Sequence, residues 1–186
     1  MLKVTPIDTS HKGYAFVEEL MNDAFPIEER RDNDKQRAKT DHNPLFTVHL
    51  ITDEKEDGSV VNVGFITSWN LGKFHFLEHF ATGPEVRNMG YGKQVLSMVI
   101  EQMSGLIILE VEEPEDELSR RRIGFYERNG FKICPNEYMQ PPYRPNNDSL
   151  PLKLMYRGQE SLDADFEYVR DTLYREVYEI TDNKKA

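Results

Sequence analysis

Three runs of hydrophobic and β-branched residues in the first half of the chain have the pattern of β-strands. They cover residues 46–52, 60–69 and 74–82. The first two runs are separated by a charged stretch that contains Asp57-Gly58, and the turn Asn70-Leu71-Gly72 follows the second. Turns of this composition join neighbouring antiparallel strands. The pattern therefore predicts three antiparallel strands in succession, with residues 4–7 as a further short edge strand.

Apolar residues at three- and four-residue spacing predict helices on either side of these strands. The first helix begins near Tyr14 and is interrupted at Pro26, and the very polar residues 28–39 are expected to form a short surface helix. A second amphipathic helix is predicted from apolar residues at helical spacing in 95–103, with its first turn at Tyr91 and Gly92, and a continuous apolar strand follows it at 106–111. The sequence therefore predicts a mixed α/β fold, with a mostly antiparallel central sheet and flanking helices.

The chain beyond residue 111 adds one helix and several short strands. The helix is predicted at residues 119–129, with Gly130 as its C-terminal stop. Five prolines mark residues 135–151 as a loop. Short strands are predicted at 131–133, 138–139 and 152–156.

A last helix, residues 161–180, is predicted from an apolar stripe at helical spacing. Ser161 is expected to cap it. We therefore expect a domain at residues 1–158 and a C-terminal helical extension at 159–186, packed on that domain or on a partner subunit.

Composition and charge narrow the class of protein. A chain of 186 residues with 38% hydrophobic residues is expected to form one globular domain, and a net charge of −10 argues against a nucleic-acid partner. The sequence has no apolar run near 18 residues and no charged-then-apolar leader, so we expect no membrane partner and a cytoplasmic protein. The single cysteine, Cys134, excludes a disulfide within the chain and a cysteine metal cluster, and no metal site is expected.

The stretch that follows residue 82 has the features of an anion-binding turn. Gly90 and Gly92 lie just before and within the first turn of the predicted helix, and Arg87 precedes them. The first amides of a helix have no intrahelical partner, and glycine lets a phosphate approach them closely. Spacing excludes a Walker loop and a dinucleotide fingerprint, because Gln94 and Val95 stand where those motifs need other residues. The alternative is that the glycines only shape a tight strand-to-helix turn.

Two segments together resemble the signatures of the GCN5-related N-acetyltransferases, the GNAT family. Residues 80–92 resemble the acetyl-coenzyme A signature, in which Arg87, Gly90 and Gly92 take the characteristic positions. Residues 125–131, Phe-Tyr-Glu-Arg-Asn-Gly-Phe, resemble the second hallmark, a helix that ends in an aromatic pair followed by Gly-Phe. The resemblance implies the GNAT fold, also called the acyl-CoA N-acyltransferase fold, and acetyl-CoA (coenzyme A) as the cofactor.

The resemblance also implies which residues bind the cofactor. Family members bind the pyrophosphate with the turn amides and the following helix N-terminus, and the strand before the turn offers N–H groups to the acetyl oxygen. Two departures affect this set: Asn88 stands where many members have glycine, and Glu112-Glu113-Pro114 where many have a cofactor-binding asparagine. The expected cofactor-binding residues are Phe80, Ala81, Thr82, Arg87, Asn88, Met89, Gly90, Tyr91, Gly92 and Lys93.

Three residues are candidates for the chemistry of acetyl transfer. Tyr126 corresponds to the tyrosine that in many members points at the sulfur of coenzyme A and can act as general acid; the alternative is that it only packs beneath the motif. Glu78 is the expected general base, because a strand carboxylate near the acetyl carbonyl can take the proton of an ammonium directly or through water. His79 is the alternative base and, by strand alternation, is expected to point to the opposite face.

Acidic and aromatic residues are candidates for the acceptor site. Carboxylates attract a cationic amine, and proline-rich loops of this kind shape the acceptor site in the family. The expected acceptor-binding residues are Glu28, Glu29, Glu110, Glu112, Tyr138 and Tyr143.

The resemblance implies an acetyl-CoA-dependent N-acetyltransferase that moves the acetyl group directly to a primary amine of a small molecule or a peptide. Tyr126 and a strand carboxylate favour this enzyme over a non-catalytic module that keeps the fold and binds acyl-CoA as a sensor or interaction partner. Transfer of a longer acyl group is a third reading, and a homodimer stays open.

Overall fold

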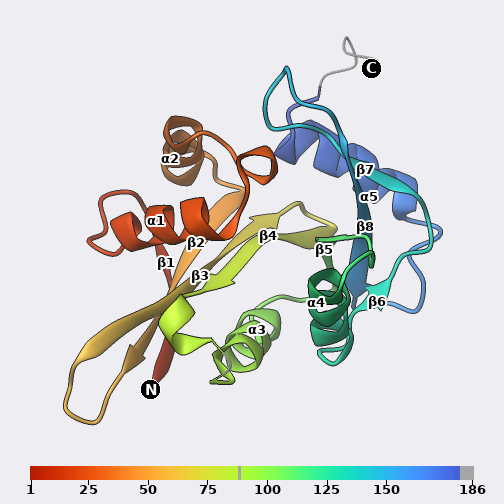
Figure 1. Cartoon of the computed structure of the whole chain (residues 1–186). Helices are drawn as coiled ribbons and strands as arrows, with labels where there is room; N and C mark the ends of the chain where they lie inside the picture. The colour runs from red at the N-terminus through yellow and green to blue at the C-terminus, as the bar shows by residue number, and fades with distance from the viewer. Residues whose placement is uncertain (88, 181–186) are drawn as a thin grey trace. The chain divides into compact units, whose positions relative to one another are not determined.

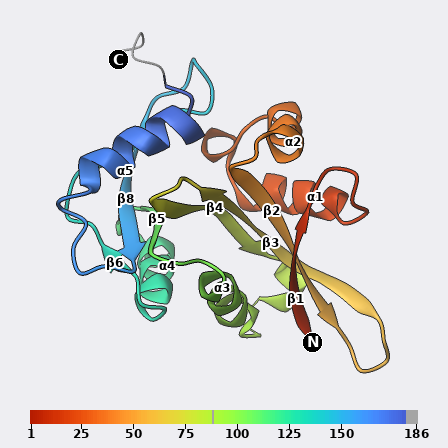
Figure 2. The same cartoon turned by 180° about the vertical axis from the view of Figure 1, so that it is seen from behind.

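The computed structural model describes residues 1–87 and 89–180, which fall into two units. The first unit comprises Met1–Asn70 and Phe76–Ser104, and the second comprises Leu71–His75 and the chain from Gly105 onward. Figures 1 and 2 show their elements from two opposite sides.

The sheet of the first unit follows the predicted succession of strands. Its order is β1 (Leu2–Ile7), β2 (Phe46–Glu54), β3 (Val60–Asn70) and β4 (Phe74–Thr82). β1 with β2, and β2 with β3, pair antiparallel, and the β2–β3 register shifts between Ile51 and Thr52. The strand predictions are thus confirmed within a few residues at each end.

Helices lie on both faces of this sheet. α1 (Tyr14–Ala24) and α2 (Asn33–His42) lie on one face, and α3 (Tyr91–Glu101) lies on the other (Figures 1 and 2). α1 buries Val17, Leu20 and Met21, and α3 buries Val95, Leu96, Val99 and Ile100, as their spacing predicts.

The polar helix predicted at residues 28–39 differs from the structure. A 3-10 turn, η1 (Ile27–Glu29), comes first, and α2 begins only at Asn33. Arg30 has an extended backbone between the two elements, and the Arg31 side chain is buried. The extended backbone at Arg30 therefore separates the 3-10 turn from α2, and the predicted single helix is two elements.

The second unit is built around one central strand. β8 (Leu150–Arg157) pairs antiparallel with β5 (Leu106–Glu112), β6 (Lys132–Ile133) and β7 (Tyr138–Gln140). α4 (Glu117–Glu127) starts with a capping box in which the Ser119 N–H donates to Asp116 at 2.7 Å. Gly130, with a φ of +84°, follows the helix as predicted.

The C-terminal helix is shorter than predicted. α5 (Phe166–Thr172) continues as a π turn, Leu173–Val177. The prediction that Ser161 caps the helix is wrong: its hydroxyl accepts from the N–H of Asp163, 3.1 Å away, and this local turn replaces the cap. The apolar stripe is nevertheless buried, Leu162, Val169 and Leu173 completely. The domain boundary expected at residue 158 stays a prediction.

The fold is mixed α/β, with a mostly antiparallel sheet and flanking helices, as predicted. Among residues 1–87 and 89–180, no helix is both long enough and apolar enough to cross a bilayer. In the same residues, His, Cys, Asp and Glu side chains form no group of three or more suited to a metal ion.

Candidate active site

The predicted anion-binding turn joins β4 to α3 in the first unit. β4 ends at Thr82, a single 3-10 turn, η2 (Pro84–Val86), follows, and α3 begins at Tyr91. Gly90 is the N-cap residue, with a φ of +81° that side chains rarely adopt. Glycine cannot cap a helix with a side chain, and among residues 1–87 and 89–180 no side chain accepts a hydrogen bond from the first amides of α3. Their partial positive charge is therefore available to an anion.

The other predicted cofactor residues lie on either side of these amides. Arg87 and Met89 are exposed, and Asn88 lies outside the described residues. At the end of β4, residues 80–82 are half-buried. A Cβ at Gly64 of β3 would collide with the Ala81 carbonyl oxygen, so glycine there permits β3 to lie close to this end of β4.

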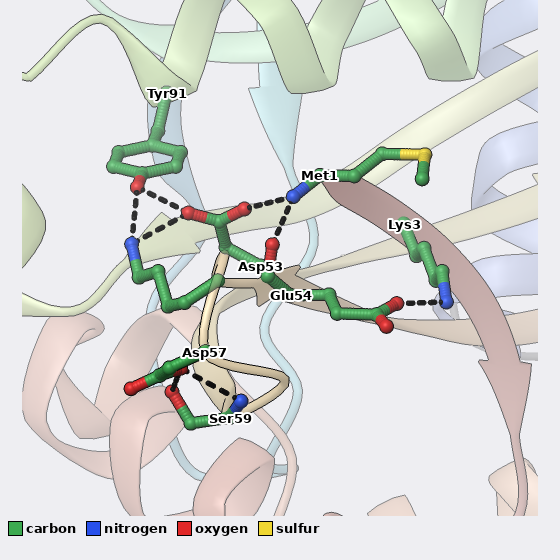
Figure 3. Close-up of polar contacts among 8 residues, drawn as sticks. Met1, Lys3, Asp53, Glu54, Asp57, Ser59 and Tyr91 are labelled. Carbon is green, nitrogen blue, oxygen red and sulfur yellow. Dashed lines mark hydrogen bonds and ion pairs between the residues drawn. The ribbon is translucent and has the colours of Figure 1, made fainter.

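Figure 3 shows how Tyr91 fixes the start of α3 to the end of β2. The Tyr91 hydroxyl donates to Oδ2 of Asp53 at 2.7 Å, and Nζ of Lys55 donates to the same oxygen at 2.6 Å. The amino group of Met1 donates to the other oxygen at 2.9 Å. These donors, Lys55 foremost, hold the pKa of Asp53 well below its usual range. The Tyr91 side chain is thus an anchor, and its backbone amide is the part left for an anion.

Glu78, the predicted general base, lies in a buried ion pair. Its Oε1 is 2.7 Å from Nη1 of Arg31; the Glu78 side chain is completely buried and that of Arg31 is 5% exposed. The indole N–H of Trp69 donates to the other carboxylate oxygen at 3.0 Å. These contacts engage the carboxylate with groups of the protein and argue against direct action on an amine. The general-base role stays a prediction.

His79, the alternative base, is also buried, and its ring lies beside Glu78, with Nδ1 3.7 Å from Oε2 of that residue. The expectation that the two side chains point to opposite faces is wrong. Thr67 contacts His79 and Trp69 contacts Glu78, and these two β3 residues, two positions apart, lie on the same face of their strand. Nε2 of His79 donates to the carbonyl of Glu29 at 3.0 Å. Burial lowers the pKa of the imidazole, which is therefore neutral at pH 7.

The predicted acceptor residues of the first unit lie in η1. Glu28 is exposed and Glu29 is half-buried. The Glu29 carbonyl contacts His79, and the nearby Arg31 contacts Glu78. The structure therefore brings Glu29, Glu78 and His79 together.

Tyr126, the predicted general acid, lies in the last turn of α4 in the second unit. Its ring packs against those of Phe125 and Phe131, with centroids 5.2 and 5.7 Å away. Burial raises the pKa of the phenol to about 12, so it is protonated at neutral pH. Within the described part of the chain, its hydroxyl has no hydrogen-bond partner. Tyr126 therefore packs against the aromatic residues of its own motif, as the alternative interpretation expects. Its protonated hydroxyl is also able to donate a hydrogen bond.

The predicted acceptor residues of the second unit gather around Glu110 of β5. The Tyr138 hydroxyl donates to one carboxylate oxygen, and the Tyr178 hydroxyl donates to the other at 2.6 Å. Burial and the neighbouring carboxylate raise the pKa of Tyr138 well above its usual value. The Tyr143 ring lies 5.1 Å from that of Tyr178. Glu112, by contrast, forms a partly exposed ion pair with Arg122 of α4.

Sequence reasoning missed three of these partners. Arg31 lies in a very polar segment, which predicts that its side chain is exposed. Its position relative to the apolar residues does not indicate burial either. Trp69 belongs to a predicted strand, but its indole partner, Glu78, could be found only from the pairing of β3 with β4. Tyr178 directly follows Val177, a residue of the apolar stripe of the last helix. The stripe predicts that this helix is buried, but it does not predict the hydrogen bond from Tyr178 to Glu110.

Comparison with known proteins gives a family match over much of the chain. A sequence profile of the acetyltransferase (GNAT) family matches residues 14–131, which include the turn at Gly90 and the helix that carries Tyr126. No curated protein sequence matches significantly.

Three solved structures are similar over 96%, 84% and 83% of the chain. One from Bacteroides thetaiotaomicron, described as an acetyltransferase of the GNAT family, is 40% identical, with a TM-score of 0.89 over 96% of this chain and 99% of that one. The ribosomal-protein-S18-alanine N-acetyltransferase from Escherichia coli is 18% identical, with a TM-score of 0.58 over 84% and 93%. A spermidine N-acetyltransferase from Vibrio cholerae is 14% identical, with a TM-score of 0.60 over 83% and 94%. At these lower identities the likeness concerns the fold alone.

Proposed function

We propose, from the premise that this chain belongs to the GNAT family of acetyltransferases, that it transfers an acetyl group from acetyl-CoA directly to a primary amine. The family match and the 40% identical structure make the chain an N-acetyltransferase. The donor, the acceptor and the residue roles below are our proposal.

The observation that carries the proposal is the start of α3. Gly90 leaves the first helix amides without a side-chain cap, and Arg87 is exposed beside them. Among the described residues other than its chain neighbours, a Cβ built on Gly90 would meet Nε2 of Gln94 alone, at 3.9 Å, so the turn is open to a close approach. A pyrophosphate suits such a site because its charge complements the helix dipole and the guanidinium. These features support the turn from Arg87 to Lys93 as the binding site for acetyl-CoA.

Acetyl-CoA, when bound, supplies the acetyl group as a thioester. The backbone N–H groups of residues 80–82 would polarise the acetyl oxygen as negative charge develops on it. The amine nitrogen forms the new bond to the acetyl carbon, the carbon–sulfur bond breaks, and the sulfur must be protonated. Tyr126 presents a phenol hydrogen for this purpose. An ordinary thiol has a pKa of about 8.5, so the Tyr126 phenol, whose pKa is raised, is the weaker acid of the two. The phenol is therefore expected to stabilise the leaving thiolate by donating a hydrogen bond to it before any proton is transferred.

The incoming amine is cationic in water and must lose a proton before it attacks. Glu78 and His79 remain the candidate bases, although their buried contacts favour another role, argued below. Glu28, Glu29 and Glu110, in a chain of net charge −10, favour a cationic acceptor. The distant neighbours include enzymes for spermidine and for an alanine of a ribosomal protein. We therefore propose an amine on a small molecule or a peptide.

The donor site is tested by calorimetric titration of acetyl-CoA into Gly90→Val and Gly72→Val proteins. Both glycines have a similar φ, +81° and +79°, so the two variants suffer similar backbone strain. The Gly90 variant is expected to bind at least about tenfold more weakly, because a branched side chain blocks the amides. The Gly72 variant should bind like the wild type. Equal affinities in all three proteins would refute the assignment of the turn.

A further inference from the structure

Within the segment from Phe25 to Arg31, the turn η1 has little apolar packing of its own. η1 contains no buried residue, and Ile27 is 52% exposed. Such a short turn has little stability of its own. Yet it carries Glu28 and Glu29, two carboxylates expected to face a cationic acceptor. Its position must therefore come from polar and aromatic contacts at its ends.

Both ends of the segment contact the same pair of β4 residues, Glu78 and His79. At one end, the Phe25 ring packs edge-on against the His79 ring, with centroids 4.7 Å apart. At the other end, Arg31 forms its ion pair with Glu78. Between them, the Glu29 carbonyl accepts from His79. Nε of Arg30 donates to the Phe25 carbonyl at 3.1 Å, which joins the two ends of the segment.

The Arg31–Glu78 pair is built to keep one geometry. Both side chains are buried, Trp69 donates to the carboxylate, and the Arg31 guanidinium carbon lies 5.6 Å from the centre of the Trp69 ring. Burial makes an unpaired charge costly, so neither partner can leave the other without a loss of stability. His79 is neutral and donates through Nε2, which leaves Nδ1 as an acceptor 3.4 Å from the Thr67 hydroxyl. Both β4 residues are thus engaged in holding the segment.

We propose that Glu78 and His79 are positioning residues. Their contacts with Phe25, Glu29 and Arg31, together called the latch, hold residues 25–31 against β4 and so fix the position of Glu28 and Glu29 relative to the acceptor amine. The effect on amine binding rests on the proposed function, whereas the positioning of residues 25–31 does not. Positioning replaces proton abstraction as the task of Glu78. The latch acts on acceptor binding and leaves acetyl-CoA binding alone.

The test compares the Glu78→Gln, Arg31→Met and doubly substituted proteins with the wild type in steady-state kinetics. Loss of the latch is expected to raise the KM for the amine by roughly 10- to 100-fold, because the carboxylates lose their fixed position. The Kd of acetyl-CoA should stay within about twofold. The double variant should be no worse than the worse single variant, since both changes break one contact. The pH profile of kcat should keep its shape.

A matched control removes another ion pair of the same unit. Arg37 pairs with Glu18 at 2.6 Å between α2 and α1, and Arg37 is about half exposed. Glu18→Gln is expected to leave the KM for the amine unchanged. Should Arg31→Met or Glu78→Gln fail to fold, Arg31→Lys keeps the charge and loosens the latch, and a smaller rise in the amine KM is expected.

Two results would overturn the latch. One is a fall in kcat of about 10²-fold or more in Glu78→Gln, with loss of the acidic limb of the pH profile and near-normal kinetics in Arg31→Met, which is the signature of a general base. The other comes from hydrogen exchange, which needs no acetyl transfer. Amides of residues 27–31 should exchange faster in Arg31→Lys than in the wild type. Unchanged exchange there would refute the latch even if the enzyme assay worked, and faster exchange would support it even if no amine were acetylated.

Discussion

Tyr126 is the residue on which the proposed chemistry depends most. The half-buried phenol stays protonated at neutral pH because desolvation raises its pKa to about 12, and its hydroxyl has no hydrogen-bond partner among the described residues. We expect Tyr126→Phe to lower turnover by roughly 10²-fold, while the Kd of acetyl-CoA changes little, because the phenyl ring retains the packing. Tyr156→Phe, which removes the hydroxyl of a buried tyrosine elsewhere in the same unit, is the control. Wild-type turnover in Tyr126→Phe, where chemistry limits the rate, would leave the residue a packing role only.

Asp53 gives a second test at this scale, through the dependence of stability on pH. The pKa of Asp53 is lower in the folded chain than the usual value of about 3.9. The ionised carboxylate therefore contributes its full share to the stability of the fold at pH values above about 3.9. The contribution is lost as the pH falls through the folded pKa. Asp53→Asn should therefore melt at a lower temperature than the wild type at pH 7, and the difference should shrink below about pH 4. Melting curves at several pH values measure this, with Asp148→Asn at an exposed position as control. A difference that stayed constant down to pH 2 would contradict the role of Asp53.

Among the elements, α5 shows what an apolar stripe does. Val169 and Leu173 are completely buried, and the contacts of Tyr174 with the Met139 carbonyl and of Tyr178 with Glu110 tie the helix region to β7 and β5. The stripe is thus buried by the chain itself. A partner subunit is not needed to cover it.

This burial makes Leu173→Ala a direct test of the helix. The change is expected to lower the free energy of unfolding by about 2–5 kcal/mol, the usual cost of removing a buried leucine. Leu118→Ala makes the same chemical change where the side chain is 70% exposed and should have almost no effect. Denaturant unfolding measures both. Equal, small effects would mean that the stripe has no structural role.

The elements also show what the sequence could predict. β3 and α3 follow their patterns because apolar periodicity is local and burial enforces it. Arg31 and Ser161 defeat such reasoning for two different reasons. Arg31 is polar yet buried, because a partner far away in the chain compensates its charge. The Ser161 hydroxyl accepts a hydrogen bond from the N–H of Asp163 and so does not cap the helix. The pattern of apolar residues cannot predict such a local turn.

At the scale of the whole molecule, the sequence predicted the fold class and family, and the structure refined the site. The glycine turn and the Tyr126 motif depend on short contiguous stretches, so a resemblance could locate both. The roles of Glu78, His79 and Glu110 depend on contacts between segments far apart in the chain, which one sequence without its fold does not reveal. The net charge of −10 and the acidic candidate residues agree with an acceptor that is cationic.

The most direct test of acetyl transfer is the release of free thiol from acetyl-CoA in the presence of a panel of primary amines, with the products identified by mass spectrometry. The panel should include polyamines, amino acids and peptides with free N-termini or lysines. We expect thiol release above the rate without enzyme for at least one amine, with one acetylated amine formed per thiol, and we expect Gly90→Val to lose it at the same acetyl-CoA concentration. A chain that binds acetyl-CoA tightly but releases no thiol with any amine, or that releases thiol without an acetylated product, would contradict transfer to an amine.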